Sequence, residues 1–120
     1  MRIESLDFEF VSLIIPDHDH SGKILEYSPA SRYANRKNWP LNKWGKGPFC
    51  HFKLGTVRSM DLLGVYAIVG GSNQVLYIGK CTGRTSTLVK RFNNGYGIIS
   101  PRNCYERGQS TNCHINHLIL

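Results

Sequence analysis

Two tyrosines and two cations are spaced so that local structure could bring them together. Ten residues separate Tyr66 from Tyr77, Lys80 follows shortly after, and Arg91 comes eleven positions later. Phenols supply hydrogen bonds and, with an ordinary pKa near 10, only a weak base at neutral pH. Lysine and arginine supply positive charge for an anionic group. Taken alone, the tyrosines would be an ordinary cross-strand aromatic pair and Arg91 a surface cation.

A β-hairpin over residues 64–79 would position the tyrosines. Residues 64–69 and 74–79 are rich in β-branched and aromatic side chains, and the sequence Gly-Gly-Ser-Asn separates them. Glycine and asparagine between two such runs are a strong hairpin signal. With a four-residue turn, Tyr66 would lie directly opposite Tyr77, and directly opposed residues share one face of a sheet.

A helix after the hairpin would position Arg91. Its N-cap is expected among residues 85–87, where three hydroxyl side chains stand in a row, and Gly95 is the expected C-terminal stop. Leu88 and Phe92, one turn apart, would form its apolar face. Arg91 would then lie at the edge where this helix meets the sheet.

These elements together resemble the GIY-YIG nuclease family. Gly64-Val65-Tyr66, the ten-residue spacing, Tyr77-Ile78-Gly79 and the helix bearing Arg91 carry the resemblance, which covers about a quarter of the chain. Residues 95–105 and 111–116 look like an extension found in one subset of that family.

The resemblance implies an α/β (α+β) fold in which a small antiparallel sheet, begun by the hairpin 64–79, is flanked by helices. It also implies a DNA endonuclease that hydrolyses one phosphodiester at a time with Mg²⁺ or Mn²⁺. By position, Tyr66 or Tyr77 would activate or orient the attacking water. Arg91 would stabilise charge on the phosphate, and Lys80 would be an auxiliary cation. A guanidinium can grip two phosphate oxygens, and phosphoryl transfer depends on positioning and charge neutralisation.

One part of the family pattern is missing. The family's metal ligand is a glutamate on a helix after a third strand, whereas the only carboxylate after Arg91 is Glu106, in a Gly-rich stretch. Asn112 and Asn116, four positions apart on an expected final helix, are poor ligands for a hard cation. The metal ligand is therefore unknown within residues 1–120, and we expect the missing strand and glutamate to follow them.

Charge is divided unevenly along the chain and points to nucleic acid. The net charge is +7, but residues 1–31 carry −4 and residues 32–120 carry +11. A segment that basic indicates a polyanionic partner, and with the resemblance we expect double-stranded DNA. The further residues that we expect to contact DNA are Arg84, Lys90, Tyr96, Arg102 and Arg107.

The chain is predicted to hold a nuclease core over residues 64–120 and an N-terminal extension over 1–63 that packs on the core or flanks it. Alternating apolar and acidic residues predict a half-buried strand over 3–15. A helix is expected over 28–38. Residues 39–48 hold two tryptophans among lysines, which we interpret as a pinned loop at the core edge, with an aromatic and cationic DNA surface as the alternative.

Two other functions compete with the nuclease. A non-catalytic DNA-binding relative on the same scaffold would explain the missing glutamate. A small zinc-stabilised interaction module is the third hypothesis, although the four cysteines form no C-x-x-C pair.

Location and assembly follow from weaker signals. Aliphatic runs reach only three residues, and the N-terminus lacks the basic start and apolar stretch of a secretory signal. We therefore expect a cytoplasmic protein with no membrane partner. A double-strand cut by a module with one site needs two copies or two events, so a homodimer is one expected assembly.

Overall fold

The computed structural model describes residues 2–3, 6–28, 40–83 and 86–120. Within these ranges, short antiparallel strands form three two-stranded ladders, and short helices follow them, so the chain has the mixed α/β fold that the sequence predicted. The strand pairs are β1 (Arg2–Ile3) with β2 (Leu6–Asp7), β3 (Ile14–Pro16) with β4 (Phe52–Leu54), and β5 (Gly64–Val69) with β6 (Val75–Cys81). No helix within the described ranges is long and apolar enough to cross a membrane.

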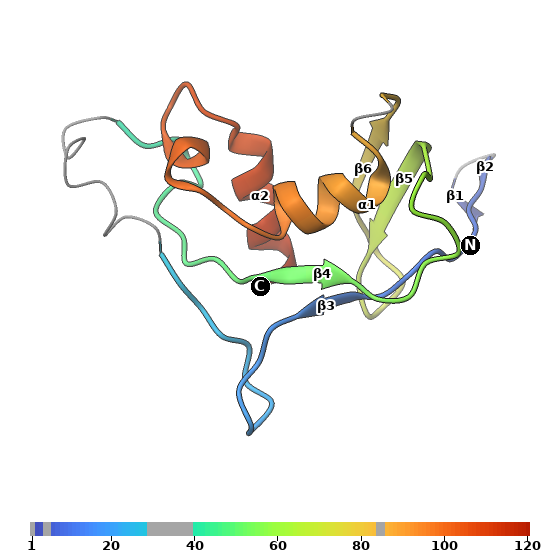
Figure 1. The fold of residues 1–120 in the computed structure, drawn as a ribbon, viewed down its shortest axis with the longest axis horizontal. Coiled ribbons are helices and arrows are strands. Elements are labelled where there is room, and N and C mark those ends of the chain that lie inside the picture. The colour runs from blue at the N-terminus through green and yellow to red at the C-terminus, as the bar shows by residue number, and fades with distance from the viewer. Residues whose placement is uncertain (1, 4–5, 29–39, 84–85) are drawn as a thin grey trace.

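The helices of the described ranges lie in the C-terminal half of the chain. The short helix α1 (Leu88–Lys90) continues directly into a π-helix (Arg91–Tyr96), followed by a 3-10 helix (Pro101–Cys104) and α2 (Ser110–Ile119). Figure 1 shows α1 and its π-helical continuation running across the middle of the molecule, between the β5–β6 hairpin and α2, with β4 passing beneath.

The hairpin forms where the sequence predicted it, but its register differs by two residues. Tyr66 pairs with Gly79, and Ile68 pairs with Tyr77. The predicted direct opposition of Tyr66 and Tyr77 is therefore wrong. The loop between the paired Val69 and Val75 is one residue longer than expected, and an irregularity after Ile68 adds the second residue. Because the shift is even, both tyrosines stay on the same face of the hairpin.

Aromatic rings join the hairpin to the helix. Phe92 meets Tyr66 edge-on, with ring centroids 5.2 Å apart, and meets Tyr96 edge-on at 5.1 Å. All three side chains are buried, with at most 8% of their surface exposed. Edge-to-face pairs of this kind add roughly 0.5–1.5 kcal/mol beyond the area they bury. This contact fixes the π-helix against the sheet face that carries the tyrosines.

The segment before the hairpin takes part in the same core. Cys50, just before β4, and Phe52, the first residue of β4, pack with side chains of the hairpin and the helix. The amide of Phe52 donates to the carbonyl of Gly97 at 3.1 Å, and a Cβ on Gly97 would lie 2.1 Å from the carbonyl oxygen of Phe52. Only glycine permits this approach of the helix end to β4.

A second buried cluster surrounds α2 on the side away from the hairpin. Trp44 packs at its edge and stacks on His114, with ring centroids 4.5 Å apart. At Trp44 this contact agrees with the pinned loop at the core edge that we predicted for residues 39–48, and Trp39 lies outside the described residues. The cluster consists of Phe49, Ile99, Cys104, Tyr105 and Cys113.

Some predicted elements differ in the structure. The strand predicted over 3–15 is wrong, because among its described residues only those in the segments 2–3, 6–7 and 14–16 pair, and Phe10 is 76% exposed. The predicted stop at Gly95 is also wrong, since the helical winding continues to Tyr96. The helix expected over 28–38 falls almost wholly outside the described residues. The final helix is confirmed as α2.

Candidate active site

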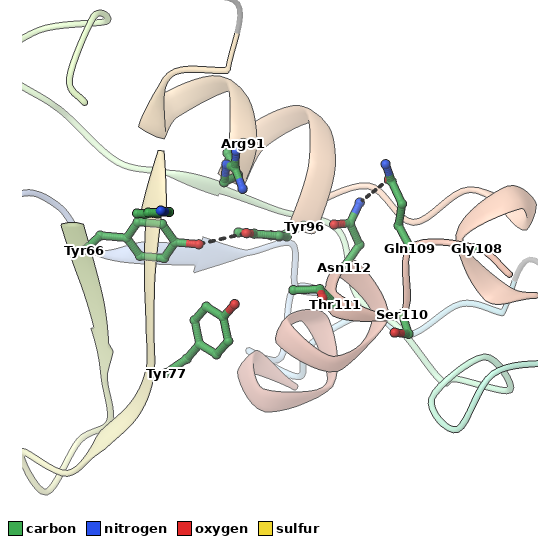
Figure 2. A pocket seen from close by; sticks show the side chains of 10 residues that line it. Tyr66, Tyr77, Arg91, Tyr96, Gly108, Gln109, Ser110, Thr111 and Asn112 are labelled. Atoms are coloured by element: carbon green, nitrogen blue, oxygen red, sulfur yellow. Dashed lines mark hydrogen bonds between the residues drawn. The ribbon is translucent and has the colours of Figure 1, made fainter. Parts of the chain in front are cut away.

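A cavity of about 410 Å³ lies between the hairpin, the π-helix and the start of α2 (Figure 2). The four side chains for which the sequence suggested a catalytic role, Tyr66, Tyr77, Lys80 and Arg91, all line it. Its remaining walls are Tyr96, Gly108, Gln109, Ser110, Thr111 and Asn112.

The glycine of Tyr77-Ile78-Gly79 makes room for Tyr66. The Tyr66 ring lies across the backbone at Gly79, its partner in the strand pairing. A Cβ on Gly79 would lie 2.6 Å from the Tyr66 hydroxyl oxygen and 2.9 Å from the Tyr77 ring, closer than van der Waals contact allows. The two tyrosine rings are 6.2 Å apart between centroids. Gly79 therefore lets two aromatic side chains of one sheet face lean into the same cavity.

Tyr66 and Tyr96 form a buried pair of phenols. Their hydroxyl oxygens are 2.8 Å apart and hydrogen-bonded. Burial, and secondly this hydrogen bond, raise the pKa of Tyr66 well above its ordinary value near 10. Arg91 opposes this rise only as a lesser influence. Tyr66 is therefore a neutral phenol at physiological pH, able to donate a hydrogen bond.

Arg91 lies beside this pair. Figure 2 shows its side chain pointing from the helix toward the Tyr66–Tyr96 hydrogen bond. Interaction with the Tyr96 side chain is the main cause that raises the pKa of Arg91, so the guanidinium stays charged. Its Nη2 donates to Ser86 Oγ at 2.8 Å. Its Nε is buried and has no hydrogen-bond partner among the described residues.

The first turn of α2 forms the opposite wall. Ser110, Thr111 and Asn112 all line the cavity. The amino end of a helix carries unpaired N–H groups and the positive end of the helix dipole. Together with Lys80 and Arg91, this wall makes the cavity suited to an anion.

Asn116 holds α2 in that position. It is fully buried, and its Nδ2 donates to the carbonyl oxygens of Cys50 at 2.8 Å and Tyr96 at 2.7 Å. Its Oδ1 accepts from the amide of Cys50 at 3.0 Å. Asn116 was expected to be a poor metal ligand. The structure places it in the core, where hydrogen bonds to the backbone satisfy its amide.

The cavity does not fit a magnesium site by itself. Mg²⁺ binds through carboxylates and phosphates and is coordinated by hard oxygen ligands, whereas the lining given above contains phenols, hydroxyls, amides and two cations. Within the described ranges, no group of three or more histidine, cysteine, aspartate or glutamate residues is arranged to hold a metal ion. Glu106 is exposed and lies outside the lining.

The residues expected to contact DNA are not all alike in the structure. Lys90, Arg102 and Arg107 are exposed, as a phosphate contact requires. Tyr96 is only 3% exposed, so its hydroxyl can act inside the cavity but its ring is not a surface contact. Arg84 lies outside the described residues.

Sequence reasoning missed two parts of the site. Thr111 and Asn112 were noted as part of an extension, and Gln109 and Ser110 were not noted at all. Ser86 was only an N-cap candidate, whereas Thr87 is the cap and Ser86 binds Arg91. Ser110 and Thr111, adjacent hydroxyl residues before an apolar periodicity, are the signal that marks such a helix start.

Comparison of the chain with protein-family models, with curated proteins and with solved structures gave no match.

Proposed function

We propose that this chain is a phosphodiester hydrolase acting on DNA, a metal-dependent endonuclease of the GIY-YIG type. The observation that supports it is the joint lining of one cavity by Tyr66, Tyr77, Lys80 and Arg91. The resemblance named these residues from motif spacing alone, and they meet although they come from two strands and a helix.

In the proposed reaction, a water oxygen bonds to phosphorus as the bond from phosphorus to one sugar oxygen breaks. The water loses one proton and the leaving sugar oxygen gains one. Arg91 and the start of α2 would bind non-bridging phosphate oxygens, on which charge accumulates. Lys80 would add positive charge at the rim, and a tyrosine hydroxyl would orient the water.

Nicking of supercoiled plasmid at low salt tests the proposal, with Mg²⁺ or Mn²⁺ added and with chelator as the blank. Arg91→Ala should lower the cutting rate by about 10²–10³-fold, as expected for loss of a charged group at a developing negative charge. The matched control is Arg58→Ala. Arg58 is an exposed arginine whose partner is Glu9, at 2.9 Å, and it lies outside the cavity lining. Its removal should leave cutting unchanged.

The second candidate function is DNA binding without cleavage, and the absence of a carboxylate from the described lining favours it. A salt-sensitive gel shift with no metal-dependent cutting would identify this function. A chain that neither shifts nor cuts DNA would contradict both functions.

A further inference from the structure

We infer that Tyr96 is a positioning residue: its hydroxyl, held beside Arg91, orients Tyr66 as a hydrogen-bond donor to the phosphate in the cavity. This inference rests on the proposed function in one respect, that the cavity receives a phosphate group. It assigns different roles to the two motif tyrosines, which the sequence left equivalent.

The direction of the hydrogen bonds follows from Arg91. A guanidinium has donors only, whereas a tyrosine hydroxyl both donates and accepts. Beside the charged Arg91, the Tyr96 hydroxyl is most stable with its oxygen toward the cation and its proton turned away. The group 2.8 Å away on the other side is the Tyr66 hydroxyl, which therefore accepts from Tyr96.

Tyr66 then keeps its own proton for another partner. A hydroxyl that already accepts one hydrogen bond becomes a better donor in the same chain. The titratable and charged groups that share the cavity with it are Tyr77 and Lys80 from β6, and Arg91 and Tyr96 from the helix. No acid is among these neighbours, so a phosphate oxygen of the ligand would be the strongest acceptor for this proton, because hydrogen bonds to charged groups are stronger than those to neutral ones.

The remaining capacity of Arg91 points to the same ligand. Of its described contacts, only the bond from Nη2 to Ser86 has hydrogen-bond geometry, so the guanidinium is held at one end. The side chain is partly exposed, and its other donors can meet phosphate oxygens. Tyr66 and Arg91 would then both donate to one anion, and Tyr77 is left as the tyrosine that orients the water.

Calorimetric titration with inorganic phosphate, at pH 7 and without metal, tests this chain of donors. The proteins are the wild type, Tyr66→Phe, Tyr96→Phe and the double variant. Each single variant should bind phosphate about 10-fold more weakly, as loss of a hydrogen bond to a charged group predicts. The double variant should bind no more weakly than Tyr66→Phe, because Tyr96 acts through Tyr66. Tyr27→Phe, which removes a hydroxyl bonded to Ile99 away from the cavity, should have no effect.

Several results would overturn the inference. These are a wild type that does not bind phosphate, a Tyr96→Phe protein with unchanged affinity, or losses that add in the double variant. The near-ultraviolet absorbance of phenolate gives a second measurement, which needs only wild type and Tyr66→Phe. If Tyr66→Phe removed a phenolate signal that forms near neutral pH, Tyr66 would be a base rather than a donor.

The measurements separate this inference from the nuclease itself. Phosphate binding with the expected coupling, but without plasmid nicking, would refute the nuclease and retain the donor chain. Plasmid nicking with additive losses at Tyr66 and Tyr96 would retain the nuclease and refute the donor chain.

Discussion

The fold treats two polar side chains differently: Asn116 of α2, which is bonded to the π-helix, and Arg91, which the π-helix carries. Asn116 is completely enclosed, and both ends of its amide are hydrogen-bonded to backbone. Arg91 is partly open, and its Nε has no partner within the described part of the chain. Tyr96 contacts both regions: its carbonyl accepts from Asn116, and its hydroxyl, beside Arg91, bonds to Tyr66.

The difference separates stability from binding. Buried polar groups in folded proteins are nearly always satisfied, and each unsatisfied one costs about 1–3 kcal/mol. Both ends of the Asn116 amide are satisfied, whereas the Nε of Arg91 is a spare donor with no partner in the described part of the chain. Spare donors beside a cavity are available to a ligand, so we associate Asn116 with folding and Arg91 with binding.

The largest expected effect comes from removing the side chain of Asn116. Asn116→Ala should lower the free energy of unfolding by about 3 kcal/mol or more, because two backbone carbonyls and one amide lose their partner in the core. Chemical denaturation measures it. Asn94→Ala, at an exposed position of the π-helix to which Asn116 is bonded, is the control and should change stability by less than about 0.5 kcal/mol. Equal effects at both positions would show that Asn116 does not hold α2.

A second test changes the cavity beside Arg91, at Gly79. Gly79→Ala should displace the Tyr66 ring, since the new Cβ would lie 2.6 Å from its hydroxyl oxygen. We expect a loss of stability of about 1–3 kcal/mol, typical of overpacking, and a loss of phosphate binding and cutting. Gly71→Ala, in the hairpin loop where a Cβ would meet nothing within 4 Å, should do neither. A Gly79→Ala protein with wild-type phosphate affinity would contradict the assigned position of Tyr66.

The smallest expected effect is a pH dependence of stability that arises from Cys50, the residue to which Asn116 is bonded. Burial raises the pKa of the Cys50 thiol from about 9 to about 11. The unfolded chain therefore loses this proton at a lower pH than the folded chain does, so this contribution to stability is complete below pH 9. It is lost as the pH rises through the range from about 9 to about 11.

Cys50→Ala should make that decline shallower in denaturation curves recorded across this range. The rest of the decline should remain, because the pKa values of Tyr66 and Cys113 are also raised. An identical slope in the variant would mean that the Cys50 thiol ionises equally in both states.

Local patterns predicted the parts of the fold that depend on neighbouring residues. The strands β5 and β6 and the N-cap region before Leu88 follow from β-branched runs, turn residues and hydroxyl caps. The face shared by Tyr66 and Tyr77 also follows, because a two-residue error in register preserves the alternation of side chains. Their direct opposition does not, since it depends on one extra residue in the loop and on the irregularity after Ile68.

Distant contacts were not predictable in the same way. Tyr96 is thirty positions from Tyr66, and only the packing of Phe92 between hairpin and helix brings their hydroxyls together. The start of α2 enters the cavity because Asn116 binds Cys50, a contact between residues 66 positions apart. The alternation over 3–15 failed because a period of two predicts a strand only where a partner strand and a core are present.

The wide winding of Arg91–Tyr96 has a geometric consequence. In an α-helix each residue turns by about 100°, so side chains five positions apart diverge by about 140° around the axis. Here the amide of Gly97 bonds to the carbonyl of Phe92, five residues back, so each turn holds more residues. Positions 91 and 96 thereby lie closer in azimuth than they would in an α-helix. The π-helical turn thus directs the side chains of Arg91 and Tyr96, which would diverge in a regular α-helix, toward the same cavity.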